Sequence, residues 1–539
     1  MTGSFELIDY VIFLGYAILI LGVGLWVSRD KKGHQKNAED YFLASKSLPW
    51  WAIGTSLIAA NISAEQFIGM SGSGFAVGLA IASYEWMAAI TLLIVGKYFL
   101  PIFIKKGIYT IPEFVEKRFS TNLKTILAIF WIALYIFVNL SSVLYLGALA
   151  FETIMDVSMI YAVFGLALFA AIYSLYGGLS AVAWTDVIQV LFLVLGGLIT
   201  TYLALDVLSD GAGFFGGFNL VLERAPEKFH MILDHSNDQY KNLPGIWVLI
   251  GGLWVANIYY WGFNQYIIQR TLAAKSLGEA QNGIALAAFL KMIIPFIVVL
   301  PGIAAYVMVN DPEVMARLGA SGQLNLPALG ASDKAYPWLL QLLPTGLKGI
   351  AFAALTAAVV SSLASMLNST STIFTMDIYK QYINKNASDR QLVHTGRLAA
   401  GIALIIACIM APLLGNIDQA FQFIQEYTGI VSPGILAVFL LGLFWKKTTN
   451  QAAIWGAIFS IPIAISLKFI PGIPFINQMG LTAIGTMILI IIISYQTGKG
   501  ADDSKGIKLD KRLFSTSPIF NISAFIICIL TSVLYTIFW

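Results

Sequence analysis

Long runs of apolar residues recur along the 539-residue chain and dominate its hydrophobic pattern. The runs are continuously apolar, whereas the strands of a membrane β-barrel alternate over about ten residues. As α-helices, runs of this length cross roughly 30 Å of hydrocarbon. The pattern therefore predicts an all-α integral membrane protein with 14 transmembrane helices. We place these helices at 8–27, 50–73, 79–103, 122–149, 158–176, 183–206, 244–264, 282–308, 345–376, 392–413, 419–444, 452–469, 477–496 and 517–538.

Basic residues are distributed unevenly between the loops that join these runs. Most lysines and arginines fall in alternate loops, near 28–49, 104–124, 270–280, 377–397, 445–449 and 499–512. The opposite set of loops is less basic and includes two long, more acidic segments at 207–243 and 309–344. Positively charged loops remain in the cytoplasm. Both termini are therefore expected outside the cytoplasm, which agrees with an even number of spans.

The composition excludes several classes of protein. The chain is 58% hydrophobic and 11% charged, whereas soluble domains carry about 25% charged residues, so a soluble globular or disordered protein is excluded. A net charge of +3 gives no support for nucleic-acid binding. The sequence has no phosphate-binding GxxxxGK[ST] loop and no metal-ligand spacing of histidines or cysteines. We expect no organic cofactor, and any uphill work must come from an ion gradient.

The second apolar run contains an unusually polar stretch from Asn61 to Gln66. Polar groups are costly in hydrocarbon, and a local break in the helix accommodates them better than a regular turn. The carbonyls near Ala59 and Ile62 would then face a cavity, where irregular backbone is tolerated at membrane depth. The alternative is an ordinary polar helix that hydrogen-bonds its neighbours.

The ninth run places Ala358, Ser361 and Ser362 at i, i+3 and i+4, on one helical face. This face offers two hydroxyls and a backbone carbonyl freed by hydroxyl crowding. Together with the carbonyls of Ala59 and Ile62, it would supply five uncharged oxygen ligands, which suit sodium, a hard cation. The alternative is that the small residues only permit close helix packing.

Polar and aromatic side chains also enter four other runs, in addition to Gln66 in the second run. They are Gln66, Glu85, Asn257, Tyr260, Trp261, Lys291, Phe421 and Gln425. Planar polar side chains with aromatic rings are typical of a sugar site, where rings cover the apolar face of the ligand. Lys291 needs a buried partner, for which Glu85 and a ligand hydroxyl are both candidates. Structural hydrogen bonding between helices is the alternative for each residue alone.

Three stretches resemble signatures of the sodium/solute symporter family. They are Tyr176–Asp186 with Gln189, Asn264–Gln265 with Gln269–Arg270, and the serine-rich stretch Ser361–Asp377. The resemblance covers essentially the whole chain and is strongest to the family's sodium-coupled galactose and glucose cotransporters. It implies a bacterial inner-membrane protein with a core of five plus five helices in inverted repeats. The ranges are 1–49 for an extra helix and loop, 50–206 for the first repeat with its broken first helix, 207–243 for an extracellular loop, 244–446 for the second repeat, and 447–539 for three further helices.

The resemblance also implies roles for individual positions. The family's sodium positions match Ala59, Ile62, Ala358, Ser361 and Ser362, and its sugar positions match Gln66, Glu85, Asn257, Lys291 and Gln425. Tyr260 matches the ring that stacks on the sugar and closes the inner gate, with Asn61 as its hydrogen-bond partner. The outer hydrophobic cover of the family matches Met70, Tyr84 and Phe421. Asp186 matches a residue of the sodium release path. Ala88 departs from the pattern, because the sugar transporters carry a serine there.

These observations predict a secondary active symporter that couples inward sodium flow to hexose uptake by alternating access, with no enzymatic activity. The nearest alternative is the same machinery with another solute, such as myo-inositol, sialic acid, pantothenate or proline. A channel or a sensor is a second alternative, although no signalling domain is evident. A membrane enzyme is the weakest alternative, because the spacing shows no set of nucleophile, base and orienting residue.

Overall fold

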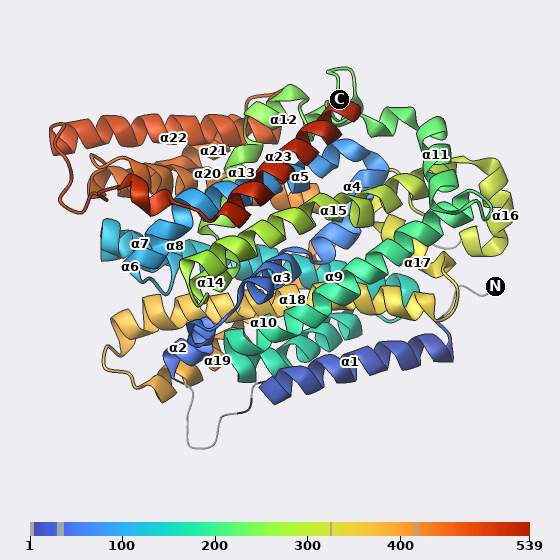
Figure 1. Ribbon diagram of the computed structural model, residues 1–539, viewed down its shortest axis with the longest axis horizontal. Helices are drawn as coiled ribbons and strands as arrows, with labels where there is room; N and C mark the ends of the chain where they lie inside the picture. The colour runs from blue at the N-terminus through green and yellow to red at the C-terminus, as the bar shows by residue number, and fades with distance from the viewer. Residues whose placement is uncertain (1–4, 28, 30–36, 324–325, 416–418) are drawn as a thin grey trace.

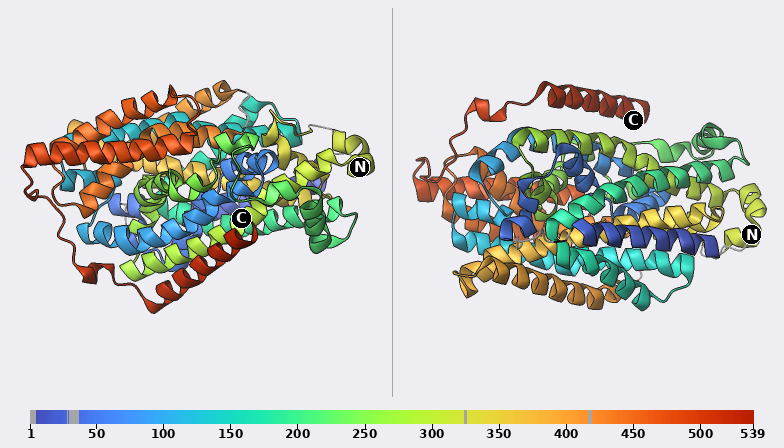
Figure 2. Two further views of the ribbon diagram at one scale, coloured as in Figure 1. Left: turned by 90° about the horizontal axis from the view of Figure 1, so that it is seen from above. Right: turned by 60° about the horizontal axis from the view of Figure 1, so that its bottom comes forward.

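The computed structural model describes residues 5–27, 29, 37–323, 326–415 and 419–539. The basic stretch 30–36 of the first loop lies outside them. The described residues form helices joined by turns and irregular loops, and the β pairing among them is one isolated bridge between Leu48 and Ala274. Most of the long helices run along the long axis of the molecule (Figure 1). Two further views show that α23 (Pro518–Ile537) lies at the edge of the bundle, at the end of an extended linker (Figure 2).

The helices that form the bundle are joined by connections of very different length. They are α1 (Leu7–Val27), α3 (Trp50–Asn61), η2 (Glu65–Met70), α4 (Ser71–Ala76), α5 (Ser83–Ile94), α8 (Thr121–Ala133), α9 (Ser141–Met155), α10 (Met159–Leu208), α13 (Leu253–Phe263), α14 (Gln265–Leu272), α15 (Leu277–Asn310), α18 (Leu347–Ile373), α19 (Asp389–Met410), α20 (Ala420–Phe444), α21 (Asn450–Lys468), α22 (Phe475–Gly498) and α23. Shorter helices lie at their ends: α2 (Ala38–Leu43), α6 (Leu100–Lys106), α7 (Ile111–Arg118), α11 (Gly213–Arg224), α12 (Ile246–Ile250), α16 (Pro312–Gln323) and α17 (Ala335–Leu342).

Within the described residues, 11 helices are long and apolar enough to cross a membrane, or 12 if one bent pair counts as a span. The pair is 238–250 with 253–263, bent by 72°, and it occupies the predicted seventh run. The predicted second run is interrupted after Asn61. The predicted fifth run contains the shorter apolar helix Met159–Ile172, because α10 kinks at Gly178 (φ +65°), where a Cβ atom would lie 2.4 Å from the carbonyl oxygen of Tyr41.

Hydrogen bonds and an ion pair link the start of α1, the last residues of the chain and the two long acidic segments to neighbouring parts of the bundle. The Asp9 carboxylate accepts hydrogen bonds from the amides of Gly346 and Gly349, at 2.7 and 2.9 Å. At the other terminus, the amide of Met231 donates to the carbonyl of Phe538 at 2.7 Å. Arg224 pairs with Asp311 at 3.0 Å and so joins the two acidic segments. The structure therefore places the start of α1 and the last residues of the chain beside loops that the charge pattern assigns to one side.

Basic loops contact one another at a separate part of the molecule. Arg118 at the end of α7 pairs with Asp503 of the linker before α23, at 3.3 Å. The amide of Asp503 donates to the carbonyl of Lys446 at 3.0 Å. The ammonium group of Lys505 donates to the carbonyl of Phe119 at 2.7 Å. These contacts join three of the loops that the sequence marks as basic.

α15 packs against α3, α4, α5 and α23 and carries two prolines inside its apolar stretch. Its contact with α4 is very close: a Cβ atom on Gly302 would lie 2.0 Å from the carbonyl oxygen of Ser71, and one on Gly74 would lie 2.6 Å from that of Val299. Backbone atoms cannot move aside as a flexible side chain can. Glycine is therefore required at these positions by the packing of the two helices.

Gly302→Ala should destabilise the protein, because the added methyl group forces α15 away from α4. Overpacking of this kind costs about 1–3 kcal/mol. Gly401→Ala in α19 is the matched control, since no atom lies within 4 Å of the added Cβ and alanine favours a helix over glycine by about 1 kcal/mol. Thermal unfolding in detergent should show a lower midpoint for Gly302→Ala alone, and equal midpoints would contradict the packing argument.

Candidate functional site

A cavity of about 50 Å³ lies between α3, η2, α5, α13, α15 and α20. Its lining consists of Asn61, Glu65, Gln66, Tyr84, Glu85, Ala88, Ala256, Asn257, Tyr260, Trp261, Lys291, Phe421 and Gln425. All the residues predicted for substrate binding are among them, although they come from segments far apart in the sequence. Of the predicted gate residues, Met70 is buried at the end of η2 outside this lining.

Lys291 forms the centre of the polar contacts in this cavity. Its ammonium group donates to the carboxylate of Glu85 and to the side-chain oxygen of Asn61, and it lies 5.1 Å from the ring centre of Trp261. Lys291 and Glu85 are almost completely buried. A buried charge needs a partner of opposite sign, and Glu85 provides it. The role of Asn61 as a second acceptor was not expected from the sequence.

Tyr260 closes the cavity toward α14. Its hydroxyl accepts hydrogen bonds from the side-chain amide of Asn61 at 3.0 Å and from the hydroxyl of Tyr266 at 2.7 Å. The bond between Asn61 and Tyr260 is the one expected from the sequence. Beyond Tyr266, Gln265 accepts from the amide of Ile111 at 2.8 Å. This wall therefore faces the basic loops.

Tyr84 and Phe421 close the opposite wall, with ring centres 4.9 Å apart in an edge-to-face contact. The chain just before α5 lies against the acidic segment 207–243, where Lys228 donates to the carbonyls of Phe75 and Ala76 at 3.2 and 2.8 Å. Burial lowers the pKa of Lys228. A cavity of about 50 Å³ has room for only a few water molecules.

The helix break predicted in the second run lies immediately beside the cavity. α3 ends at Asn61, and Ile62 has extended backbone angles (φ −80°, ψ 105°). The amide of Ser63 donates to the side-chain oxygen of Gln66 at 3.0 Å, so it does not continue the helical ladder to Ala59. The hydroxyl of Ser362 then donates to the carbonyl of Ala60 at 3.1 Å and lies 3.5 Å from that of Ala59.

Of the five positions predicted for sodium, Ser362 contacts the carbonyls of Ala59 and Ala60 where α3 ends against α18. Ala59, Ile62, Ala358, Ser361 and Ser362 are all fully buried. The expectation that the crowded serine hydroxyls free the backbone carbonyl of Ala358 is wrong. α18 runs through Ala358 without a break, and the two serine hydroxyls point across to neighbouring helices rather than back at their own carbonyls.

Ser361 connects these positions to Asp186, the residue predicted for sodium release. The hydroxyl of Ser361 donates to the carboxylate of Asp186 at 2.6 Å, and that of Ser56 donates to the other oxygen at 2.5 Å. Asp186 is fully buried in α10. Since a hydroxyl that donates its proton keeps two lone pairs, the Ser361 oxygen can still bind a cation.

Arg270 is the main functional candidate that the residue-by-residue reasoning missed. Its guanidinium group lies 3.4 Å from Asp186 and donates to the carbonyl of Ser56 at 3.0 Å, to Ser365 and to the carbonyl of Tyr266. It is 1% exposed. The available signal was an arginine at the end of a family signature, adjacent to an apolar run.

Glu65 is a second residue without a predicted role. It lines the cavity, and one of its carboxylate oxygens has no hydrogen-bond partner among the described residues. It opens η2, a π-helix, and π-bulges are frequent at functional sites. Its position next to Gln66 in the polar stretch was the available signal.

A model of the sodium:solute symporter family matches residues 41–460 of this chain. The chain belongs to the sodium:solute symporter family. This symporter is 67% identical over 533 residues to the sodium/glucose cotransporter of Vibrio parahaemolyticus, an alignment that covers 99% of this chain and 98% of that protein. It is 34% identical over 465 residues to the human sodium/myo-inositol cotransporter 2, which covers 84% of this chain and 68% of that protein.

A solved structure of an Na⁺-coupled sialic acid symporter has the same fold as this family member. The two superpose with a TM-score of 0.80 at 24% sequence identity, covering 93% of this chain and all of the other. The family membership and the fold agree with the resemblance found in the three sequence signatures. The all-helical architecture is thus established independently of the hydrophobic pattern.

Arg270→Gln should destabilise this symporter strongly, because it leaves the buried carboxylate of Asp186 without a cation. Breaking a buried ion pair on one side costs about 3–5 kcal/mol. Adding Asp186→Asn should restore much of that loss, because the remaining groups are then neutral. Thermal midpoints of the two single variants and the double variant form the test. Purely additive losses would show that the two residues do not interact.

Proposed function

We propose that this protein is a secondary active symporter that couples inward sodium flow to the uptake of a hexose such as galactose or glucose. The observation that carries the proposal is the shared boundary at the end of α3. Asn61 contributes to the polar cavity, while the adjacent carbonyls of Ala59 and Ala60 contact Ser362. One helix end therefore serves both clusters. The relative named as a sodium/glucose cotransporter supports the same substrates.

The cluster at the end of α3 suits a monovalent cation. We propose that sodium is bound by the backbone carbonyls of Ala59, Ile62 and Ala358 and by the hydroxyls of Ser361 and Ser362. Hard cations take oxygen ligands, and an uncharged ligand set lets a monovalent ion leave again. Asp186 is hydrogen-bonded to Ser361, and its carboxylate is the first group that binds the sodium ion as it leaves this cluster.

The cavity offers the mixture of donors and acceptors that a sugar needs. We propose that Gln66, Glu85, Asn257, Lys291 and Gln425 bind hydroxyls, while Tyr260 and Trp261 cover an apolar face. The side-chain nitrogen of Asn257 has no hydrogen-bond partner among the described residues, so it is free to donate. Ala88 leaves one part of the wall without a hydroxyl, which distinguishes this cavity from the family pattern.

Transport follows from these two sites by alternating access. Sodium joins α3 to α18 and stabilises an outward-open form. In this form the side chains of Met70, Tyr84 and Phe421 are separated and leave the outer side of the cavity open. Sugar closes the cover, and displacement of Tyr260 opens the inner path. An ion biases such an equilibrium only through its different affinity for the two states. One sodium ion at 100 mV and a tenfold gradient supplies about 3.7 kcal/mol, enough for roughly 500-fold accumulation.

We also propose that the chain has 14 transmembrane helices, ten of them in two inverted repeats. Three segments add one span each to the 11 long apolar helices and so give 14. They are the second run broken after Asn61, the short apolar helix before Gly178 and the bent pair at 238–263. The ranges 50–206 and 244–446 are the two inverted repeats, flanked by 1–49, 207–243 and 447–539. The protein lies in the inner membrane of a bacterium. Because its basic loops face the cytoplasm, both termini lie on the other side of the membrane.

Uptake of labelled galactose into proteoliposomes tests the function directly. An inward sodium gradient should drive accumulation above the equilibrium level, and a potassium gradient should not. Competition by glucose, myo-inositol, sialic acid and proline then ranks the substrates. Uptake that ignores sodium would contradict symport, and competition by myo-inositol or proline instead of hexoses would assign the same machinery to another solute. Flux far above carrier turnover would indicate a channel.

Ser362→Ala should weaken the sodium dependence of uptake, because it removes one ligand and one contact between α18 and α3. Galactose binding at saturating sodium should survive. Ser174→Ala is the matched control, since this buried serine also donates to a carbonyl, that of Ala364 at 3.2 Å, outside the cluster. The measurement is the sodium concentration for half-maximal uptake; an unchanged value in Ser362→Ala would defeat the site assignment.

Lys291→Gln should weaken galactose binding about 10- to 100-fold, because a hydrogen bond from a charged donor contributes about 1.5–3 kcal/mol. Sodium activation should change much less. Lys124→Gln is the control, since Lys124 is a buried lysine paired with Glu116 at 2.6 Å outside the cavity. Equilibrium binding of labelled galactose decides the question, together with thermal unfolding to show that both variants are folded. Normal affinity in Lys291→Gln would remove this residue from the sugar site.

A further inference from the structure

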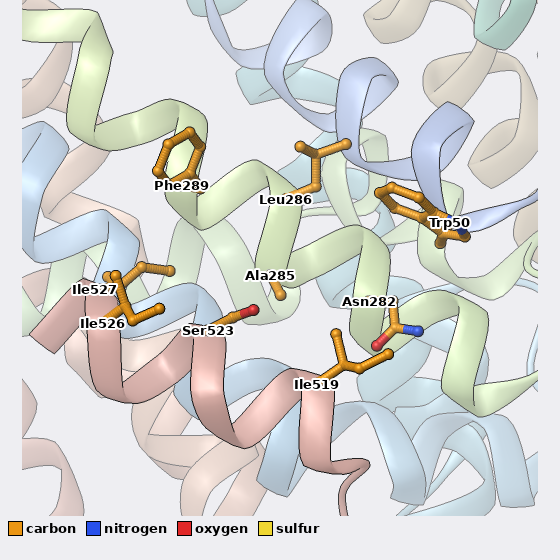
Figure 3. Close-up of a pocket in the computed structure, with 9 residues that line it drawn as sticks. All are labelled: Trp50, Asn282, Ala285, Leu286, Phe289, Ile519, Ser523, Ile526 and Ile527. Carbon is orange, nitrogen blue, oxygen red and sulfur yellow. The ribbon is translucent and has the colours of Figure 1, made fainter.

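A groove of about 400 Å³ opens between α15 and α23, with Trp50 of α3 at one end (Figure 3). Asn282, Leu286 and Phe289 lie at i, i+4 and i+7 and form a stripe along α15. Ile519, Ser523 and Ile526 form a stripe of the same spacing along α23. Such spacing places each set on one helical face, and Figure 3 shows Asn282 of α15 beside Ile519 of α23.

The groove lies at the hydrocarbon surface of the bundle. Both helices are long and apolar enough to span the membrane, and only 22% of the apolar window of α23 is buried within the protein. The large apolar side chains of the groove remain half exposed, with 47% for Phe289, 66% for Ile519 and 46% for Ile526. Such an apolar surface inside a bilayer is covered by acyl chains or by another helix.

Basic residues lie close along the chain to the segments that form one end of the groove. The hydroxyl of Ser517 lies 3.4 Å from the side-chain oxygen of Asn282 and fixes the start of α23 there. Lys511 and Arg512, both exposed, precede this point. Exposed Lys275 is bound through its amide to the carbonyl of Leu48 at 3.2 Å, two residues before Trp50.

Two acidic residues near these segments, Glu279 and Asp510, accept hydrogen bonds from backbone amides. Glu279 accepts from the amide of Trp50 at 2.6 Å. Asp510 accepts from the amide of Arg512 at 3.0 Å. The basic end belongs to the loops that the charge pattern assigns to the cytoplasm, where the membrane leaflet is rich in anionic lipids.

We propose that this groove binds one anionic phospholipid, with an acyl chain between α15 and α23 and the phosphate beside Lys275, Lys511 and Arg512. Basic pockets between transmembrane helices on the cytoplasmic side bind anionic headgroups in this way. A second copy of the chain is disfavoured as occupant, because a twofold interface would bring two identical basic ends together.

A lipid in this groove contacts the same helix, α15, that carries Lys291 of the substrate cavity. Lys291 follows Phe289 by two residues, which places it about 200° around α15, on the opposite face. A lipid on one face of α15 thus supports the helix that presents Lys291 on the other. Binding of the lipid itself is nevertheless independent of which solute the protein carries.

Native mass spectrometry of the purified full-length protein tests the proposal, with phosphatidylglycerol and phosphatidylcholine of identical chains as probes. The protein should retain one phosphatidylglycerol per chain in preference to phosphatidylcholine. Ser523→Phe fills the groove and should abolish this retention. Ser532→Phe, an exposed position farther along α23 outside the groove, should leave it unchanged.

The basic end is tested separately by combining Lys275→Gln, Lys511→Gln and Arg512→Gln. Each cation near an anionic headgroup contributes about fivefold, so the triple variant should bind phosphatidylglycerol about 100-fold more weakly and lose the headgroup preference. Lys380→Gln with Lys385→Gln, exposed lysines elsewhere, is the control. Equal retention of both lipids by the unmodified protein would overturn the proposal. A dimer that Ser523→Phe dissociates would also overturn it, in favour of a second copy.

Discussion

The end of α3 is the feature on which the functional arrangement depends. At Ser63 the backbone amide turns from the helical ladder to the side chain of Gln66. This exchange of one hydrogen-bond acceptor leaves the carbonyls of Ala59 and Ala60 available to α18. Irregular backbone at membrane depth is stable only where protein or a polar cavity satisfies it. Gln66 and Ser362 provide this here, and Asn61 then reaches into the cavity on the other side.

Buried hydrogen bonds connect the two clusters. From Lys291 the chain of contacts passes through Asn61 to Tyr260 and on to Tyr266. The carbonyl of Tyr266 accepts from Arg270, which lies 3.4 Å from Asp186, the carboxylate that holds Ser361. In a low-dielectric interior each bond of such a network is strong, and each lost partner is costly. A change at one cluster therefore alters the hydrogen bonding available at the other.

Several features of the fold could be predicted from residue patterns because they follow from local physics. Continuous apolar runs specify helices, and a polar stretch such as Asn61–Gln66 within one marks a break. The glycines at 251 and 252, and at 178, mark places where runs bend, but the size of a bend depends on what packs against it. For the same reason the pattern did not show that Ser361 and Ser362 turn toward neighbouring helices instead of their own carbonyls.

The sequence by itself determined that the chain is an all-helical membrane protein with polar side chains inside its spans, because hydrocarbon imposes length and composition on every segment. Its signatures also indicated the symporter family. Only the tertiary structure decided which buried charges pair. Glu85 with Lys291 and Asp186 with Arg270 are separated by 206 and 84 residues. No spacing along a chain encodes such pairs, because their geometry is set by how whole helices pack.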